Sequence, residues 1–352
     1  MSGSREPAYA EQARGVALRV GRETVNRLAG QLSIAAVDLF TDMTGTQLIQ
    51  TDDGSGFSRQ LAMRNVELLE AGGRFVVVSG DSAEVVRAQF VRHLPPSSKP
   101  VALHVVSGSG YEIHRYGFRP GANKWSGRRV ARGLEVSLDA RERLLSRLLS
   151  LVVERLPSAD LARRSGAFAK RLLSPRGARV DLRDHGVQVD ETLYAEVTPN
   201  KVTLYAPRLQ ATDLVVHSLL DAVAVDRSIR RLSTSNGLNV IRGENFVDLI
   251  SSTKSEGLAA YFERCESGSR SRASGPRWAL VLGDGANDRD LFHAPALDRY
   301  SRVVRVFVGR EPRVVAPRPT WGDDFIVLPG ESTRGTEYVM ERLAGGSINR
   351  AL

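Results

Sequence analysis

The chain has 352 residues, of which 42% are hydrophobic and 25% charged, so it carries enough apolar material for about two folded domains. Its formal charge is +9, but it has neither zinc-finger spacing nor the aromatic signature of an RNA-binding sheet, so we expect no nucleic acid partner. The single cysteine, Cys265, excludes an internal disulfide, and no apolar run approaches the roughly 18 residues of a membrane span. We therefore expect a soluble, cytoplasmic protein without a membrane partner.

The first predicted element is a helix over residues 5–31, where Ala, Val and Leu recur at roughly helical spacing. An apolar stripe of this kind needs a partner surface. The stripe could pack on the rest of the chain or on a second subunit, so a homodimer is an open alternative.

Strand-like and helix-like segments then alternate, as in an α/β domain. Gly72-Gly73 is a usual stop for a helix, and Asp81 with Glu84 resembles an N-cap with its capping-box partner. In chain order we predict a strand over 33–42, a polar flap over 47–58, a helix over 59–70, a strand over 74–78, a helix from 81 to about 93 and a strand over 101–106.

The pattern changes between about residues 120 and 236. A long helix with a leucine stripe is predicted over 138–156, and a second helix over 213–225. Short strands are predicted over 187–189, 192–197 and 201–205, after a loop over 157–186. Helices over a small antiparallel sheet are typical of an inserted α+β domain.

Strand character returns near residue 238 and continues, with helices between, to the end of the chain. We predict strands over 238–242, 246–250, 279–282, 303–308 and 325–328, helices over 254–263 and 336–343, and an exposed loop over 267–276.

Acidic and amide side chains gather where one of these strands ends. The apolar residues 279–282 lead into Gly283-Asp284-Gly285 and then Asn287-Asp288. In an open parallel sheet, ligands bind at this carboxyl edge. The oxygens of Asp284 and Asp288 suit a hard divalent cation, although a plain loop with an Asp N-cap would have the same composition.

Three other polar residues follow apolar runs in the same way. Residues 34–41 run into Asp42, residues 75–78 run into Ser79-Gly80, and the segment 248–260 carries Lys254. Each has an ordinary explanation when taken alone: a turn aspartate, a strand-to-helix turn and a solvated helix lysine. Their order and spacing together favour a functional interpretation.

These segments resemble, in order, the four motifs of the haloacid dehalogenase superfamily of phosphotransferases. The first motif, D-x-D-G-T, is similar to Asp42-Met43-Thr44-Gly45-Thr46, and the last, G-D-x-x-N-D, to residues 283–288. The resemblance implies an α/β fold, with a Rossmann-like parallel-sheet core and an inserted α+β cap. The implied domains are an N-terminal helical extension over 1–31, a core over 32–118 and 237–352, and a cap over 119–236.

The resemblance also implies phosphoryl transfer through an aspartyl phosphate on Asp42. The implied catalytic residues are Asp42, Thr44 and Lys254. The implied phosphate-binding residues are Ser79, Gly80, Lys254 and Asn287. The implied ligands of a Mg²⁺ cofactor are Asp42, Thr44 through its backbone carbonyl, Asp284 and Asp288.

Two residues depart from the family pattern. Thr44 stands where the family usually has a second aspartate, and Asp81 stands where an arginine often follows the second motif. A threonine hydroxyl cannot act as an acid or base near neutral pH. The substrate could have a good leaving group, another carboxylate such as Asp81 could substitute, or hydrolysis could be slow or lost.

The resemblance to the large-cap branch, which includes phosphomannomutase and the sucrose-, trehalose- and mannosylglycerate-phosphate phosphatases, implies a Mg²⁺-dependent phosphatase. The expected substrate is a small phosphorylated metabolite, a sugar or sugar-acid phosphate. Two alternatives are a catalytically weakened protein that binds a phosphorylated ligand and a phosphotransferase with an acceptor other than water.

Overall fold

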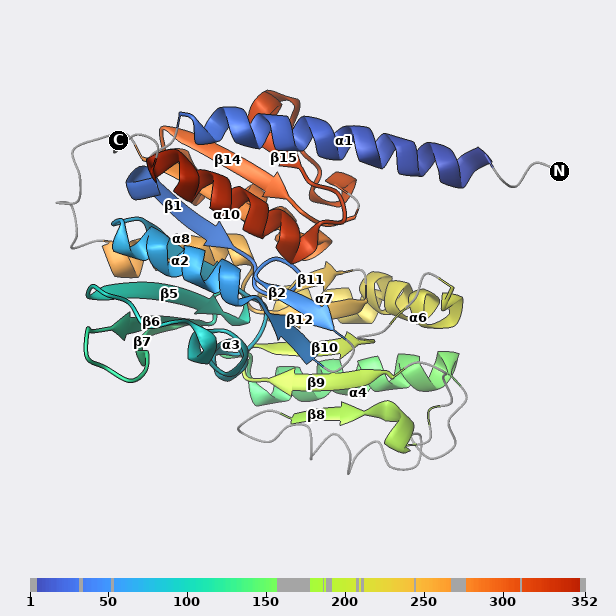
Figure 1. Cartoon of the computed structure of the whole chain (residues 1–352). Helices are drawn as coiled ribbons and strands as arrows, with labels where there is room; N and C mark the ends of the chain where they lie inside the picture. Colours follow the sequence, from blue (N-terminus) through green and yellow to red (C-terminus); the bar gives the residue numbers. More distant parts are fainter. Residues whose placement is uncertain are drawn as a thin grey trace. The chain divides into compact units, whose positions relative to one another are not determined.

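The computed structural model describes residues 5–31, 34–51, 54–156, 178–185, 187, 192–206, 209, 212–243, 245–266, 277–310 and 312–348. The chain forms two compact units (Figure 1). The first comprises Met1–Arg132 with Lys254–Leu352, and the second comprises Gly133–Thr253. None of the described helices is both long and apolar enough to cross a membrane.

The first unit is built on an eight-stranded sheet with the order β15-β14-β13-β1-β4-β5-β6-β7. Its strands are β1 (Val37–Thr41), β4 (Arg74–Val78), β5 (Val101–Ser107), β6 (Glu112–Phe118), β7 (Ser126–Arg132), β13 (Trp278–Gly283), β14 (Arg302–Phe307) and β15 (Phe325–Val327). The strands from β15 to β5 are parallel, while β6 and β7 are added in antiparallel pairs. A short hairpin of β2 (Leu48–Thr51) and β3 (Gly54–Phe57) follows β1.

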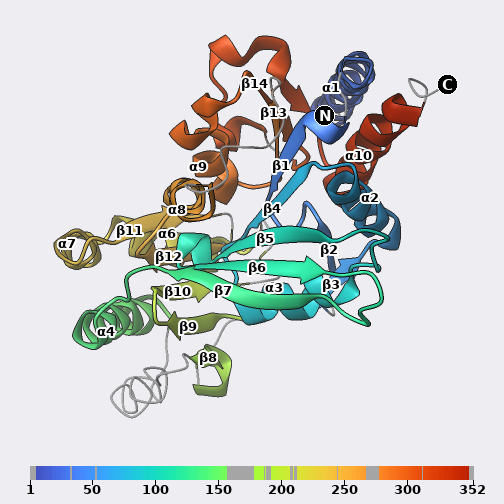
Figure 2. The same ribbon diagram turned by 90° about the vertical axis from the view of Figure 1, so that its left-hand side faces the viewer.

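Helices cover both faces of this sheet. They are α1 (Arg5–Ala29), α2 (Arg59–Glu70), α3 (Ala83–Gln89), α8 (Lys254–Glu266), α9 (Arg289–Phe292) and α10 (Ser332–Ile348). One apolar core joins α1, α2, α3 and α10 to one face, and another joins α8 and α9 to the opposite face. Figure 2 shows α2 and α10 on one side of β1 and β4, with α8 on the other. Both faces of the parallel strands are therefore buried, which explains their continuous apolar runs.

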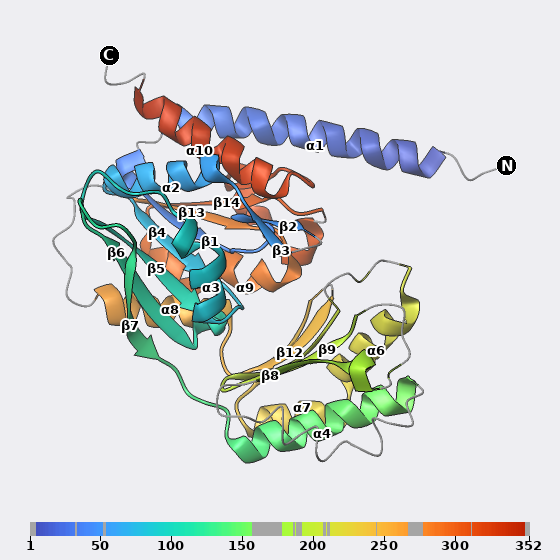
Figure 3. The same ribbon diagram turned by 60° about the horizontal axis from the view of Figure 1, so that its bottom comes forward.

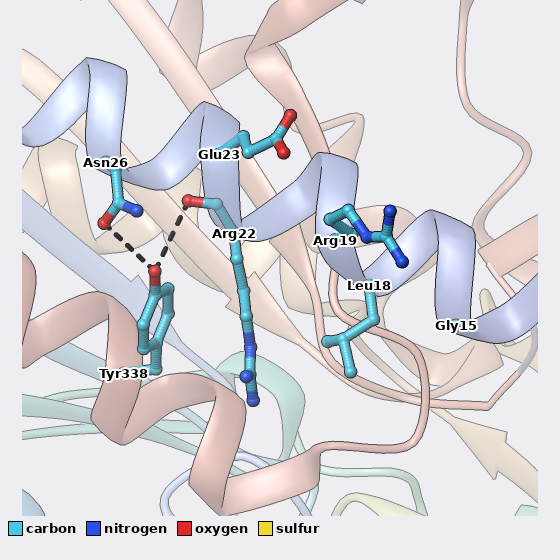
Figure 4. Close-up of a pocket in the computed structure, with 7 residues that line it drawn as sticks. All are labelled: Gly15, Leu18, Arg19, Arg22, Glu23, Asn26 and Tyr338. Carbon is cyan, nitrogen blue, oxygen red and sulfur yellow. Dashed lines mark hydrogen bonds between the residues drawn. The ribbon is translucent and has the colours of Figure 1, made fainter.

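The C-terminal half of α1 packs on the core of its own unit, which confirms one of the two predicted alternatives. Val25 and Leu28 are buried, and Gly21 lies so close to β15 that a Cβ there would be 2.2 Å from the carbonyl of Val327. Figure 4 shows the open pocket between α1 and Tyr338 of α10, whose hydroxyl donates to the side chain of Asn26 at 3.0 Å. The pocket contains none of the candidate site residues.

The second unit has a five-stranded antiparallel sheet with the order β11-β12-β10-β9-β8. Its elements are α4 (Leu138–Arg155), β8 (Ala178–Asp181), β9 (Tyr194–Thr198), β10 (Lys201–Tyr205), α6 (Leu214–Val225), α7 (Arg227–Ser235), β11 (Asn239–Arg242) and β12 (Phe246–Ile250). The helices α4, α6 and α7 pack on one face of the sheet (Figure 3), where their leucines and valines form one core.

The unit boundaries fall later in the chain than the sequence predicted. Residues 126–132, assigned to the cap, form β7 and pair with β6 of the first sheet. β11 and β12, which were assigned to the core, belong to the second sheet, where β12 pairs with β10 and β11 pairs with β12. A strand's local pattern does not reveal its hydrogen-bonding partner, so both ends of the insert were placed too early.

The structure also contains two elements that the sequence did not predict. Residues 178–181, predicted as loop, form β8, and residues 227–235, for which no element was predicted, form α7. The predicted loop residues 157–177 and 267–276 lie outside the described residues, and so does most of the strand predicted over 187–189.

Candidate active site

Two neighbouring parallel strands place two aspartates at the same edge of the first sheet. β1 pairs with β13 in a register that joins Thr41 to Leu282, and the next polar side chains are Asp42 and, two residues beyond Leu282, Asp284. The amide of Asp42 donates to the carbonyl of Leu282 at 3.0 Å, which continues the pairing to the end of the strand. Asp42 and Asp284 are more than 200 residues apart in the chain, and the sheet brings them together at its carboxyl edge.

Three carboxylates and one ammonium group form the centre of the site. Oxygen atoms of Asp42, Asp284 and Asp288 all lie within 4.8 Å of one another. Nζ of Lys254 donates to Oδ1 of Asp42 at 2.5 Å and to Oδ1 of Asp288 at 2.6 Å. Asp42, Asp288 and Lys254 are buried, whereas Asp284 is partly exposed. The cluster is thus accessible mainly from the side of Asp284.

The loop that carries Asp284 is held by Asp288. Oδ2 of Asp288 accepts hydrogen bonds from the amide of Asp284 at 2.8 Å and from the amide of Gly285 at 3.0 Å. A Cβ at Gly283 would lie only 2.7 Å from the Asp288 side chain, so the close approach requires glycine. Asp288 therefore fixes the backbone of the loop with one oxygen and binds Lys254 with the other.

The loop after β1 supports Asp284 from the opposite side. Gly45 has a positive φ of 81°, and a Cβ there would lie 1.9 Å from Oδ2 of Asp284. Thr46 donates its hydroxyl hydrogen to Oδ1 of Asp284 at 3.2 Å. Thr44, in the same loop, is half-buried and forms a single β-bridge with Leu48. Gly45 and Thr46 therefore each have a structural role: Gly45 allows the loop to approach Asp284 closely, and Thr46 donates a hydrogen bond to it.

Burial and crowding shift the ionisation of this cluster. Burial raises the pKa of Asp42 to about 7 although Lys254 opposes the shift, and Asp288 adds to it. Burial, with Asp288 and Asp42, also raises the pKa of Asp284 well above its ordinary value, even though this side chain keeps some exposure. Burial alone would lower the pKa of Lys254, but Asp288 and Asp42 outweigh it and raise that pKa.

The charge balance of the cluster fits a divalent cation. One ammonium group cannot neutralise three carboxylates, and the neighbouring carboxylates add to burial, the larger cause, in raising the pKa values of Asp42 and Asp284. The donor set consists of carboxylate oxygens, which hard cations such as Mg²⁺ prefer. The residues present therefore fit the expected cofactor.

The third strand of the site is β4, which pairs with the other side of β1. Thr41 is the register partner of Val77, so Ser79 and Gly80 leave the sheet at the same edge as Asp42. Ser79 is buried, and its hydroxyl donates to Oδ2 of Asp81 at 3.1 Å. Asn287, the remaining predicted residue, is partly exposed in the short 3-10 helix η5 (Ala286–Asp288) beside the carboxylates.

The structure brings the four charged residues predicted for the site into one cluster, in which Lys254 contacts Asp42 and Asp288 directly. It places Ser79 and Gly80 at the end of a neighbouring strand and Asn287 in the adjoining loop. Sequence reasoning missed Ser332, the first residue of α10, whose hydroxyl donates to the carbonyl of Gly45 at 2.5 Å. Ser332 has a positive φ of 47°, which a sequence pattern does not reveal. It supports the loop that carries Asp42.

Comparisons with known proteins identify the fold. No protein-family model and no curated protein sequence matches the chain. Among solved structures, it is similar to the C-terminal domain of trehalose-6-phosphate phosphatase from C. albicans, with a TM-score of 0.55, 14% identity and coverage of 92% of this chain and 96% of that chain. The likeness confirms the expected fold, an α/β core with a large insert.

Two other solved structures are less similar in shape. One is a haloacid dehalogenase-like hydrolase from B. subtilis, with a TM-score of 0.48, 17% identity and coverage of 87% of this chain and 99% of that chain. The other is a C-terminally truncated IMP-nucleotidase from Plasmodium falciparum, with a TM-score of 0.48, 11% identity and coverage of 92% and 76%.

Proposed function

We propose that the protein is a Mg²⁺-dependent phosphatase that hydrolyses a small phosphorylated metabolite through an aspartyl phosphate on Asp42. The observation that carries the proposal is the buried contact of Lys254 with Asp42 and Asp288, next to the carboxylate of Asp284. A sugar or sugar-acid phosphate is the proposed substrate class. The fold shared with a trehalose-6-phosphate phosphatase domain supports it by analogy. The single cysteine is consistent with cytoplasmic localisation.

In this proposal Asp42 is the nucleophile. A carboxylate attacks phosphorus when it is oriented and when repulsion between the two anions is reduced. Lys254 holds one oxygen of Asp42 at 2.5 Å and supplies a fixed positive charge in a buried place, where it stabilises charge that develops on the phosphoryl group. Ser79, Gly80 and Asn287 would bind the phosphate oxygens from the adjoining strand end and loop.

The cation would be held by Asp42, Asp284, Asp288 and the backbone carbonyl of Thr44. When bound, Mg²⁺ supplies positive charge that offsets the repulsion between the carboxylates and a phosphate. Asp288 also keeps Lys254 and the loop of Asp284 in place, so its loss should disturb binding and catalysis together.

Thr44 supports the two alternative functions. It cannot transfer a proton near neutral pH, so a phosphorylated Asp42 could be long-lived. A long-lived phosphoenzyme could pass its phosphoryl group to an acceptor other than water, and a protein without turnover could act as a binding protein for a phosphorylated ligand.

One screen separates these functions. The full chain would be incubated with Mg²⁺ and a panel of phosphorylated metabolites, and both phosphate release and binding would be measured. A phosphatase releases phosphate from at least one compound, and Asp42→Asn abolishes the release. Binding without release would favour the binding protein. Formation of a new phosphate ester from an added alcohol, without matching phosphate release, would favour the phosphotransferase.

A further inference from the structure

The proposed reaction needs a group that can give up and recover a proton. When the bond between phosphorus and the ester oxygen breaks, a poor leaving group must receive a proton, and general acid help is typically worth ~10²–10⁴-fold. The described structure commits Asp42 and Asp288 to Lys254, and it places Asp284 among the proposed cation ligands. The hydroxyl of Thr44 does not titrate in the useful range.

A further carboxylate, that of Asp81, lies in the turn after β4, the strand that pairs with β1. It lies two residues after Ser79, and β4, which ends just before Ser79, is hydrogen-bonded to β1, which ends just before Asp42. Neighbouring strands are about 5 Å apart, so the turn after β4 borders the same edge as Asp42. Asp81 is half-exposed and is in no ion pair among the described residues, so its carboxyl is accessible to water and to a substrate.

The turn holds Asp81 firmly against Ser79. The hydroxyl of Ser79 donates to Oδ2 of Asp81 at 3.1 Å, and the amide of Asp81 donates back to the same hydroxyl oxygen at 3.1 Å. The carbonyls of Ser79 and Asp81 accept hydrogen bonds from the amides of Ser109 at 2.8 Å and Gly108 at 2.7 Å. The first two bonds close the turn, and the last two fix it to the loop after β5.

The loop after β5 is itself strained. Ser109 has a φ of 52°, in the left-handed region that favours glycine. Such a conformation persists only where the surrounding structure enforces it, and it often accompanies a functional constraint. Here the strained residue supplies the amide that anchors the carbonyl of Ser79.

We propose that Asp81 is the general acid and base of the reaction, held at the sheet edge by the turn that its amide closes with the hydroxyl oxygen of Ser79. The inference rests on the proposed function. The hydroxyl of Ser79 donates to Oδ2 of Asp81 in the structure. When a phosphate binds, this hydrogen turns to a phosphate oxygen, and the carboxyl of Asp81 gives its proton to the ester oxygen. Asp81 thus takes the role that Thr44 cannot perform, from a different strand of the same sheet edge.

The proton balance closes over the two steps. In the first step, an oxygen of Asp42 forms a bond to phosphorus, the bond to the ester oxygen breaks, and Asp81 gives its proton to the departing alcohol. In the second step, water attacks the phosphoryl group on Asp42 and gives a proton to Asp81. The bond between phosphorus and Asp42 breaks, inorganic phosphate leaves, and Asp42 is a carboxylate again.

Leaving-group dependence tests this role, because a merely structural role would not change it. p-Nitrophenyl phosphate and phenyl phosphate are similar in shape, but the second has a much poorer leaving group. We expect Asp81→Asn to lower kcat/KM for phenyl phosphate at least about tenfold more than for p-nitrophenyl phosphate. Glu84→Gln is the matched control, since it removes an exposed carboxylate of the same helix start and should change neither value.

The outcomes separate the inference from the proposed function. Restoration of phenyl phosphate hydrolysis by Thr44→Asp in the Asp81→Asn background would support the inference. Equal losses on both substrates, or no loss, in folded Asp81→Asn would overturn the role of Asp81 and leave the phosphatase intact. A wild type that hydrolyses no phosphate ester in the presence of Mg²⁺ would overturn the proposed function and this inference together.

Discussion

Nζ of Lys254 lies 2.5 Å from Oδ1 of Asp42, although 212 positions separate the two residues in the chain. Asp42 follows β1, and Lys254 begins α8 at the point where the chain returns to the first unit. Their buried contact joins the two segments from which this unit is built. Breaking it should therefore change both activity and stability.

Asp42→Asn should abolish phosphatase activity and leave the fold intact. The amide has nearly the shape of the carboxylate but is a poor nucleophile. Initial rates with Mg²⁺ and circular dichroism of the purified variant provide the check. Substantial activity in the folded variant would exclude a covalent role for Asp42.

Lys254→Met should lower kcat by at least about 10³-fold, since it removes a preorganised charge at the reacting group. It should also destabilise the protein by about 3–5 kcal/mol in EDTA, because Asp42 and Asp288 would keep their burial without their cation. Urea unfolding and steady-state rates measure the two effects separately. Unchanged stability would show that the ion pair is not maintained in solution.

The pKa of Asp42 predicts how stability depends on pH in the absence of a divalent cation. Its ordinary value is 3.8 and its folded value about 7, so between these limits the folded chain binds a proton that the unfolded chain has lost. The contribution to stability is fully present below pH 3.8 and is lost as the pH rises through about 7. The free energy of unfolding in EDTA should therefore decline from pH 5 to pH 8, and less so for Asp42→Asn.

Added Mg²⁺ should reverse this decline. A ligand that binds only the folded state raises stability by mass action, and deprotonated carboxylates bind it best. The shift in thermal midpoint on adding Mg²⁺ should be larger at pH 8 than at pH 5. A shift of equal size at both values, or none, would argue against a cation site at Asp42, Asp284 and Asp288.

Thr44→Asp should raise the hydrolysis rate for phosphate esters with poor leaving groups, since it adds a carboxyl beside the nucleophile. Initial rates at saturating Mg²⁺ for wild type and variant test this. A fast wild type that is slowed by Thr44→Asp would show that an added carboxyl at this position obstructs the existing proton route.

Two arginines of α4 should respond in opposite ways to the same substitution. Nε and Nη1 of Arg141 are buried without a hydrogen-bond partner in the described structure, whereas Arg147 pairs with Asp226 at 2.7 Å. Arg141→Met should be neutral or stabilising, because it replaces unsatisfied donors by apolar atoms. Arg147→Met should cost about 1 kcal/mol. Urea unfolding compares them, and a large loss for Arg141→Met would reveal a partner such as bound water.

The sequence predicted best those elements whose ends are marked locally. The predicted helix 59–70 coincides with α2, where Ser58 caps the first turn and Ala71 precedes the two glycines, and the predicted strand 74–78 coincides with β4. β7 was missed because its residues are exposed and arginine-rich, with no apolar alternation. β12 was assigned to the wrong sheet because its partner, β10, can be recognised only from the folded chain.

The same distinction applies to the site. Asp42, Asp284 and Asp288 could be predicted to converge, because each follows a strand or a turn with a recognisable pattern. The place of Lys254 in the same site was expected from resemblance alone. The hydrogen bond between Ser79 and Asp81 depends on the turn geometry and on the strained loop at Ser109. Neither feature can be predicted from a sequence pattern.

The most direct test of the account is rapid acid quenching of the full chain during turnover with Mg²⁺, followed by mass spectrometry of the peptide that contains Asp42. The account predicts a phosphoryl group on Asp42 of the wild type, and none in Asp42→Asn or after removal of Mg²⁺. Phosphate release by Asp42→Asn at the wild-type rate, or a phosphoryl group on another residue of an active wild type, would contradict it.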